Sequence, residues 1–322
     1  AIHSLHGAEA TGIQVADSGI GYNNNPSSGV QIIDNDIDAP AGIVVYAEGS
    51  SVGVGEGSFG PSTRLLVLNR GNHATVDEAS LGQYARTDRP TTAAQFNATL
   101  VNASIGYARK AQDAISNSAS GATVTLSAHT FVEDLTVSVN SLTLLGSGQD
   151  QTTIVGTNTA INVAANGLTI RDLTVTDSQI WNIGAHGVSG LTLENVTLAN
   201  STTSDGALIS NASSVTITNV TATGNGRHGV NLNTVDVATV SGVHAYSNTG
   251  SGLNITRTLA GAAGGITVDS GTFTGNDIGI NVYTNSGEVA GVSIEGEIDA
   301  SGNGRGGIVL FAEFYRIYRC SK

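Results

Sequence analysis

The chain has 322 residues, with 42 Gly, 4 Pro, 1 Cys and no Met, and 12% of its positions are charged. Pro is too rare and Gly too irregular for collagen, and one Cys excludes both a disulfide framework and a cysteine-based zinc site. The formal net charge of −13 offers no basic surface to nucleic acid, and no apolar run approaches the ~18 residues of a membrane span. We therefore expect that the protein neither binds nucleic acid nor inserts into a membrane.

Residues 1–75 contain segments that resemble the far end of the chain. Gly42-Ile-Val-Val-Tyr-Ala-Glu48 matches Gly307-Ile-Val-Leu-Phe-Ala-Glu313 at identical or conservative positions, and Ile37-Asp-Ala39 mirrors Ile298-Asp-Ala300. This predicts that residues 1–75 are coils from the tail of a preceding unit in a tandem array, whose neighbouring repeat units are then partners. The alternative is that they pack onto the main segment as extra coils.

Residues 76–121 are expected to form a connector with a short N-terminal capping helix. Val101 to Ser116 carries Ala, Ile, Tyr, Arg, Lys and Gln at helical spacing, and Gly121 follows. Such a helix would cover the open end of the first coil and hide an exposed strand edge.

Residues 122–313 are expected to form the main segment, and from residue 142 two short strands repeat about every 22 to 28 residues. The first strand of each unit alternates apolar and polar residues, which buries one face, and a Gly precedes each second strand. A propeller blade needs ~40–45 residues and four strands, and a sandwich would not repeat one motif in register. The pattern predicts an all-β parallel β-helix. First strands include 168–175, 191–198, 215–222 and 266–273, and second strands include 230–232, 253–255, 280–282 and 308–310.

One Asn recurs at the same turn of successive coils. Asn225, Asn248 and Asn276 each lie eight positions after the central apolar residue of their coil, and Asn303 lies nine after its own. Stacking would place these amides above one another, each donating to one neighbour and accepting from the other. We expect a structural ladder.

Residues 314–322 break the composition, since they carry three of the 13 basic residues and the only Cys. They are either a native polar tail or vector-encoded residues, and we assign Cys320 no function.

The coil Asn225-Gly-Arg-His-Gly-Val-Asn-Leu232, followed by Asn248-Thr-Gly-Ser-Gly-Leu-Asn-Ile255, resembles the right-handed parallel β-helix superfamily of pectate lyases. It is most similar to the catalytic modules of mannuronan C5-epimerases and to tandem β-helix surface proteins, over about residues 105–312. The resemblance implies a right-handed helix and a site with Tyr, Asp, His and a nearby basic residue. In the best-matching stretch His186 agrees, whereas Trp181 replaces the Tyr and Gly184 stands near the Asp position.

Alignment of the second strands predicts a lateral face that could bind an extended sugar chain. His186, Ser210, Asn233, Thr256 and Tyr283 form one outward row, beside a row of Asn231, Asn254 and Asn281. Proton transfer needs a carboxylate or His within hydrogen-bond reach of the proton that moves. We expect His228, Asp205, Arg227 and His186 as catalytic residues, with Asp205 and His228 the best pair, and Tyr283, Asn231, Asn233, Asn254 and Trp181 as substrate-binding residues.

Each of these residues also has a structural interpretation. A single outward His is more often solvated, Tyr283 suits surface packing, and Arg227 and Arg305 suit ion pairs with neighbouring turns. Asp205 and Asp277 are too many coils apart for the two carboxylates of a glycosidase. No cofactor is expected, except that Asp34, Asp36 and Asp38 could ligate Ca²⁺ without the glycine-bearing loop of a known motif.

Two functions follow. The first is an extracellular or cell-surface β-helix that binds polysaccharide and, if it is an enzyme, acts as a hydrolase, lyase or epimerase. The second is a non-catalytic tandem-repeat adhesin or structural protein. The fold supports either, because fold alone does not determine function.

Overall fold

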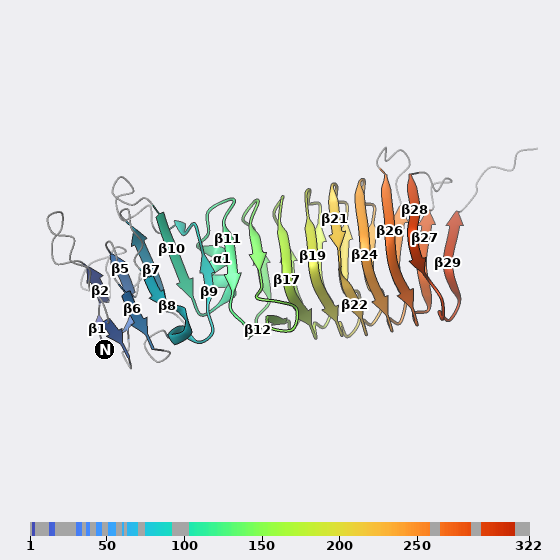
Figure 1. The fold of residues 1–322 in the computed structure, drawn as a ribbon. Helices are drawn as coiled ribbons and strands as arrows, with labels where there is room; N and C mark the ends of the chain where they lie inside the picture. Colours follow the sequence, from blue (N-terminus) through green and yellow to red (C-terminus); the bar gives the residue numbers. More distant parts are fainter. Residues whose placement is uncertain are drawn as a thin grey trace, which may run out of the picture. The chain divides into compact units, whose positions relative to one another are not determined.

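The computed structural model describes residues 2–3, 13–16, 30–33, 37–38, 43–46, 51–55, 60, 63–69, 75–91, 103–257, 265–284 and 291–312. The chain divides into two compact units, residues 1–129 and 130–322. Nearly all described elements in both are β-strands (Figure 1). The tail at 314–322, with Cys320, lies outside the described residues.

The second unit consists of short strands that alternate between two parallel sheets, as the period-two repeats predict. One sheet has the order β13-β16-β18-β20-β23-β25-β27-β29, and the other has the order β14-β17-β19-β21-β24-β26-β28, with β12, β15 and β22 pairing alongside it. The predicted all-β parallel β-helix is confirmed. The first sheet contains β13 Leu135–Val137, β16 Thr159–Val163, β18 Trp181–His186, β20 Ala207–Ser210, β23 Val230–Asn233, β25 Ser251–Arg257, β27 Ile278–Thr284 and β29 Gly306–Ala312. The remaining strands are β12 Thr130–Val132, β14 Thr143–Leu145, β15 Thr153–Val155, β17 Thr169–Thr176, β19 Thr192–Ala199, β21 Val215–Thr218, β22 Thr221–Thr223, β24 Ala238–Tyr246, β26 Ile266–Thr274 and β28 Val292–Asp299.

The first unit combines parallel coils with an antiparallel segment. Strands β2, β5 and β7 pair in parallel, as do β3, β6 and β8, and β1 with β4. Strand β10 then runs antiparallel between β7 and β9, and β9 pairs antiparallel with β11. The elements are β1 Ile2–His3, β2 Ile13–Ala16, β3 Val30–Ile32, β4 Ile37–Asp38, β5 Ile43–Tyr46, β6 Ser51–Val54, β7 Arg64–Asn69, β8 Thr75–Asp77, a 3₁₀-helix at Glu78–Leu81, β9 Ala85–Thr87, β10 Ala103–Ala108, α1 Ala111–Ser116 and β11 Thr123–Leu126.

The expected helix over residues 101–116 is shorter than predicted. Residues 103–108 form β10, which is paired along both edges, and only Ala111–Ser116 is helical. Two-sided strand pairing overrides the weak helical propensity of this segment. Helix α1 buries Ala111, Ala114 and Ile115 and packs on β9, β10 and β11 of its own unit. Its proposed capping role is not confirmed.

Turn positions explain why Asn, Ser and Gly are so frequent. A bend recurs at the same point of successive coils, with positive φ at Asn195 (53°), Asn219 (51°), Gly242 (62°) and Ser270 (60°). Left-handed backbone is least costly for Gly and for short polar side chains. The amides also stack, since Asn219 donates to the Oδ1 of Asn195 at 3.3 Å.

The predicted asparagine ladder is confirmed inside the second unit. Asn225 Nδ2 donates to Asn248 Oδ1 at 2.8 Å, Asn248 Nδ2 to Asn276 Oδ1 at 2.9 Å, and Asn276 Nδ2 to Asn303 Oδ1 at 3.3 Å. Each Oδ1 also accepts the backbone N–H of the preceding ladder residue. The first three are buried, so the amides satisfy turn groups that water cannot reach.

A column of glycines makes room for this ladder. A Cβ on Gly229 would lie 2.6 Å from the carbonyl oxygen of Gly252 and 3.0 Å from Asn248 Nδ2, and Gly206, Gly252 and Gly279 are equally crowded. This is the physical reason for the Gly that precedes each second strand.

Gly229→Ala is therefore expected to lower the free energy of unfolding of the second unit by about 1–3 kcal/mol, the usual cost of overpacking. Gly304→Ala is the matched control, because its Cβ would meet nothing closer than 3.6 Å. Urea unfolding followed by the fluorescence of Trp181, the single Trp, measures both. Equal effects at the two glycines would contradict the packing argument.

Candidate functional site

The parallel register places side chains of successive coils above one another on the β18–β20–β23–β25–β27 sheet. His186, Ser210, Asn233, Thr256 and Tyr283 are consecutive register partners, as predicted for the outward row, although Ser210 is only 6% exposed. The neighbouring row of Asn231, Asn254 and Asn281 is also in register. Equivalent positions of four successive coils are occupied by Trp181, Asp205, His228 and Ser251. Each of them lies two residues before one of the register partners Ile183, Ala207, Val230 and Leu253.

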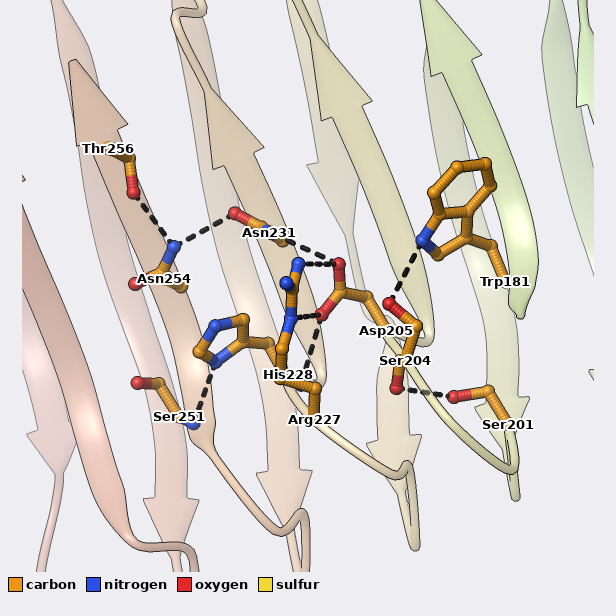
Figure 2. A network of polar contacts seen from close by, with 10 residues as sticks. All are labelled: Trp181, Ser201, Ser204, Asp205, Arg227, His228, Asn231, Ser251, Asn254 and Thr256. Atoms are coloured by element: carbon orange, nitrogen blue, oxygen red, sulfur yellow. Dashed lines mark hydrogen bonds and ion pairs between the residues drawn. The ribbon is translucent and has the colours of Figure 1, made fainter. Parts of the chain in front are cut away.

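The centre of this face is a buried carboxylate held by four donors (Figure 2). Asp205 is fully buried. It accepts hydrogen bonds from Arg227 Nε at 2.8 Å and Nη2 at 2.6 Å, from the backbone N–H of His228 at 3.1 Å, and from Asn231 Nδ2 at 3.0 Å. We call Asp205, Arg227, His228 and Asn231 the Asp205 cluster.

The Arg227 guanidinium neutralises this buried charge. Its side chain is 50% exposed, so the ion pair connects the interior with solvent. Its hydrogen bond with Asp205 raises the pKa of Arg227 further above its ordinary value. The predicted ion pairs of Arg227 and Arg305 with neighbouring turns are both present, and Arg305 pairs with Asp277. That second pair is largely exposed, with Arg305 at 72%.

His228 is a neutral hydrogen-bonding group at neutral pH. Burial lowers its pKa to about 4, Asp205 opposes that shift, and Arg227 adds to it. Its Nδ1 accepts the backbone N–H of Ser251 at 2.9 Å. The ring proton therefore resides on Nε2. The Nε2–H group can donate a hydrogen bond to a molecule bound beside His228.

The depressed pKa of His228 predicts a loss of stability in mild acid. An unfolded His titrates near 6.5, so between pH 6.5 and about 4 the unfolded chain binds the extra proton and the folded chain does not. Stability from this residue is present above pH 6.5 and is lost as pH falls toward 4, by at most about 3 kcal/mol.

Urea midpoints of wild type and His228→Gln, compared at pH 7 and pH 4.5, test this. The difference in midpoint between the two proteins should shrink at pH 4.5, because Gln carries no titrating group. His244→Gln is the control, since His244 is exposed. An acid loss that is unchanged in His228→Gln would contradict the assignment.

Trp181 and His186 are the first and last residues of β18, and their side chains meet on the sheet surface. Their rings meet edge to face, with centroids 5.4 Å apart. Trp181 Nε1 donates to Ser204 Oγ at 3.1 Å, and His186 Nδ1 lies 2.5 Å from Ser210 Oγ. His186 is exposed. The stretch singled out by the resemblance thus presents an indole edge and an imidazole on the sheet surface.

The second amide row is less accessible than predicted. Asn231 and Asn254 are 4% and 6% exposed, because their amides bond to each other and to neighbours. Asn254 Nδ2 donates to Asn231 Oδ1 at 2.9 Å and to Thr256 Oγ1 at 2.9 Å. Little of either amide is therefore exposed to solvent, and their contact with a substrate stays a prediction. They hold Asp205 and the outer row in place.

The remaining predicted binding residues lie farther along the same face. Asn233 accepts a hydrogen bond from Thr234 Oγ1 at 3.2 Å. Tyr283, two coils beyond Asn233 in the outer row, stacks on Phe311 with centroids 5.5 Å apart and planes 9° apart. Trp181 and Tyr283 therefore belong to opposite ends of the candidate face.

Sequence reasoning missed Asn182, Ser204 and Ser251. Asn182 stands in the glycine column, where its fully buried amide donates to Asn225 Oδ1 at 3.2 Å and takes the place of a missing ladder residue. The departure from Gly at that position was the available signal. Ser204 contributes a hydroxyl acceptor and Ser251 contributes a backbone N–H donor. Composition reveals neither contact.

A second feature lies on the other sheet. A shallow depression of ≈ 690 Å³ over β24, β26 and β28 is lined by residues that include His244, Thr272, Glu297 and Asp299. His244 Nδ1 lies 2.7 Å from Thr272 Oγ1. Neither chain pattern nor motif predicted it.

In the described part of the chain, no three His, Cys, Asp or Glu side chains are grouped as metal ligands would be. Asp34 and Asp36 lie outside the described residues and only the backbone of Asp38 is described, so the Ca²⁺ site stays a prediction. Within the same ranges no helix has the length and apolar character to cross a membrane.

Residues 149–297 match the family described as right-handed β-helix region. Among solved structures, ORF18 of Geobacillus virus E2 aligns at 14% identity over 59% of this chain and 52% of its own, with a TM-score of 0.35. The chain thus spans about half the length of that protein. The periplasmic alginate epimerase AlgG aligns at 9% identity over 84% of this chain and 75% of its own, with a TM-score of 0.34. No curated protein matches the sequence.

Proposed function

We propose that this protein is an extracellular or cell-surface β-helix that binds an extended polysaccharide along the outer row, without transforming it. The polar groups repeat once per coil, so one chain laid across the coils meets a donor or acceptor at each step. Trp181 and Tyr283 add aromatic surface at the two ends, and His228 adds a donor at the edge.

The burial and hydrogen bonding of Asp205 are the observation that favours binding over catalysis. A general acid or base must reach the proton that it transfers. Asp205 is buried and already accepts four hydrogen bonds. The Nδ1 of His228, its one basic nitrogen, is likewise occupied by Ser251. Both residues of the best predicted acid/base pair therefore act as fixed parts of a surface.

Charge favours a neutral glycan over a polyuronate. The formal net charge is −13, and Arg227 on this face is already paired with Asp205. Long-range repulsion should slow and weaken the association of an anionic chain. We expect β-glucan or xylan to bind more tightly than alginate or pectin, and the preference should narrow as salt is raised.

Binding is tested by affinity electrophoresis and calorimetry with β-glucan, xylan, alginate and pectin. Trp181→Ala and Tyr283→Ala should each weaken binding about tenfold, in line with ~1–1.5 kcal/mol for a lost aromatic contact. Tyr246→Ala is the matched control, because Tyr246 is 43% exposed on the other sheet. Equal losses in all three variants, or no binding to any glycan, would remove the proposal.

Catalysis is the second candidate and has its own readout. The same four polysaccharides are incubated with the protein and examined for new reducing ends and unsaturated products. We expect none. Product that forms with wild type and disappears in His228→Gln would assign the face to an enzyme, whereas product that persists in His228→Gln would place the chemistry elsewhere.

A further inference from the structure

We propose that the end of the second unit formed by β28 and β29 is a docking surface for one further β-helix coil of the sequence type found at residues 51–69. Three large apolar side chains of β29 are exposed there: Ile308 at 47%, Leu310 at 63% and Phe311 at 51%. No other strand of the described residues exposes such a group.

Two of these side chains continue the buried core columns. Ile308 is the register partner of Ile280 and Leu310 that of Val282, and those partners are 0% and 2% exposed. Ile308 and Leu310 are thus core residues by position. They are exposed because no strand of the described residues pairs with the outer edge of β29, whose backbone groups are left as a template for pairing.

The first unit shows the same pair of strands with a coil in place. Strands β2 and β5 pair with Ile13 opposite Ile43, just as β27 and β29 pair with Ile280 opposite Ile308. The sequences agree, since Gly42-Ile-Val-Val-Tyr-Ala-Glu48 matches Gly307-Ile-Val-Leu-Phe-Ala-Glu313. Yet Ile43 is 0% exposed, because β7 covers it with Leu65 in register.

The strand beside this pair has a counterpart as well. Val30-Gln-Ile32 of β3 corresponds to Val292-Ser-Ile294 of β28. In the first unit β6 pairs with β3, with Val52 opposite Val30, and the packed residue Ile32 is 4% exposed. Strands β28 and β29 therefore both have counterparts in the first unit, β3 and β5, and a further coil pairs with each counterpart.

These counterparts define the chemistry of the occupant. It must offer two short parallel strands with alternating apolar residues, as β6 does with Val52 and Val54 and β7 does with Leu65 and Val67, all at most 1% exposed. It must also begin where β29 ends, as residues 49–69 follow Glu48. A coil of this sequence type meets both conditions.

The test extends the full chain. Residues 314–322 are replaced by a second copy of residues 49–129, so that Glu313 takes the place of Glu48. We expect hydrogen exchange of the β29 amides to slow on the order of tenfold or more, and binding of the dye ANS to fall. The control extension carries Leu65→Asp and Val67→Asp in the added copy, and should leave exchange unchanged.

Three results would overturn the proposal. The first is β29 exchange that is the same with the intact and the control extension. The second is faster β29 exchange in a chain that stops at Glu313, which would make residues 314–322 the occupant. The third is a dimer of the unextended chain that Leu310→Lys dissociates, which would assign the surface to a second copy.

Discussion

Replacing Asp205 with Ala is expected to destabilise the second unit by about 3 kcal/mol and to abolish polysaccharide binding. The substitution leaves the Asn231 amide and the His228 N–H without an acceptor, and both lie in a buried network. Breaking a buried ion pair costs ~3–5 kcal/mol. The lower end applies because Arg227 is half exposed and regains water. Urea unfolding followed by Trp181 fluorescence gives the loss of stability.

The chain supplies its own control for this prediction. Asp277 makes a similar pair with Arg305, but the pair is exposed and should contribute at most ~1 kcal/mol. Asp277→Ala is therefore expected to change the unfolding midpoint little and to leave binding intact. If Asp205→Ala proves as mild as Asp277→Ala, the network does not organise the face.

A conservative variant separates the charge from the shape. Asp205→Asn keeps the volume but replaces one acceptor oxygen with a donor that faces the Arg227 guanidinium. We expect it to weaken binding nearly as much as Asp205→Ala while retaining more stability. A circular dichroism spectrum of each variant shows whether it is folded, so that binding is compared between folded proteins.

The architecture was largely predictable because it follows from periodicity. Alternating residues such as Leu191–Leu198 can bury one face only as strands, and the Asn spacing of 225, 248 and 276 fixes the register between coils. The same register aligns the residues of the predicted outward row. Features that depend on one-dimensional repetition are therefore visible in the sequence.

The failures have a different physical origin. The alternation of apolar and polar residues predicts that Asn231 points away from the core. Its burial depends on Asp205 and Asn254, which lie in neighbouring coils. Residues 103–108 look helical locally, and only pairing on both edges makes them β10. The charge state of His228 likewise depends on burial and on the Ser251 N–H, neither of which a motif reveals.

Asn248→Ala is expected to lower the free energy of unfolding of the second unit by about 3–4 kcal/mol. Its Oδ1 accepts from the N–H and the Nδ2 of Asn225, and its Nδ2 donates to the carbonyl of Ala222 and to Asn276 Oδ1. The residue is 3% exposed, so these groups lose their partners away from water. Each unsatisfied buried group costs ~1–3 kcal/mol, and partial relaxation reduces the sum.

Two further variants show whether the cost comes from the ladder itself. Asn162→Ala removes an amide that is exposed on β16 and should change stability by no more than ~0.5 kcal/mol. Asn303→Ala removes the last amide, which lies partly exposed at the end of the ladder, and should fall between the two. A flat series across these positions would mean that the amides only fill space. A graded series would mean that the turns are held together coil by coil, so that damage at Asn248 reaches the adjacent His228–Ser251 contact and weakens glycan binding as well.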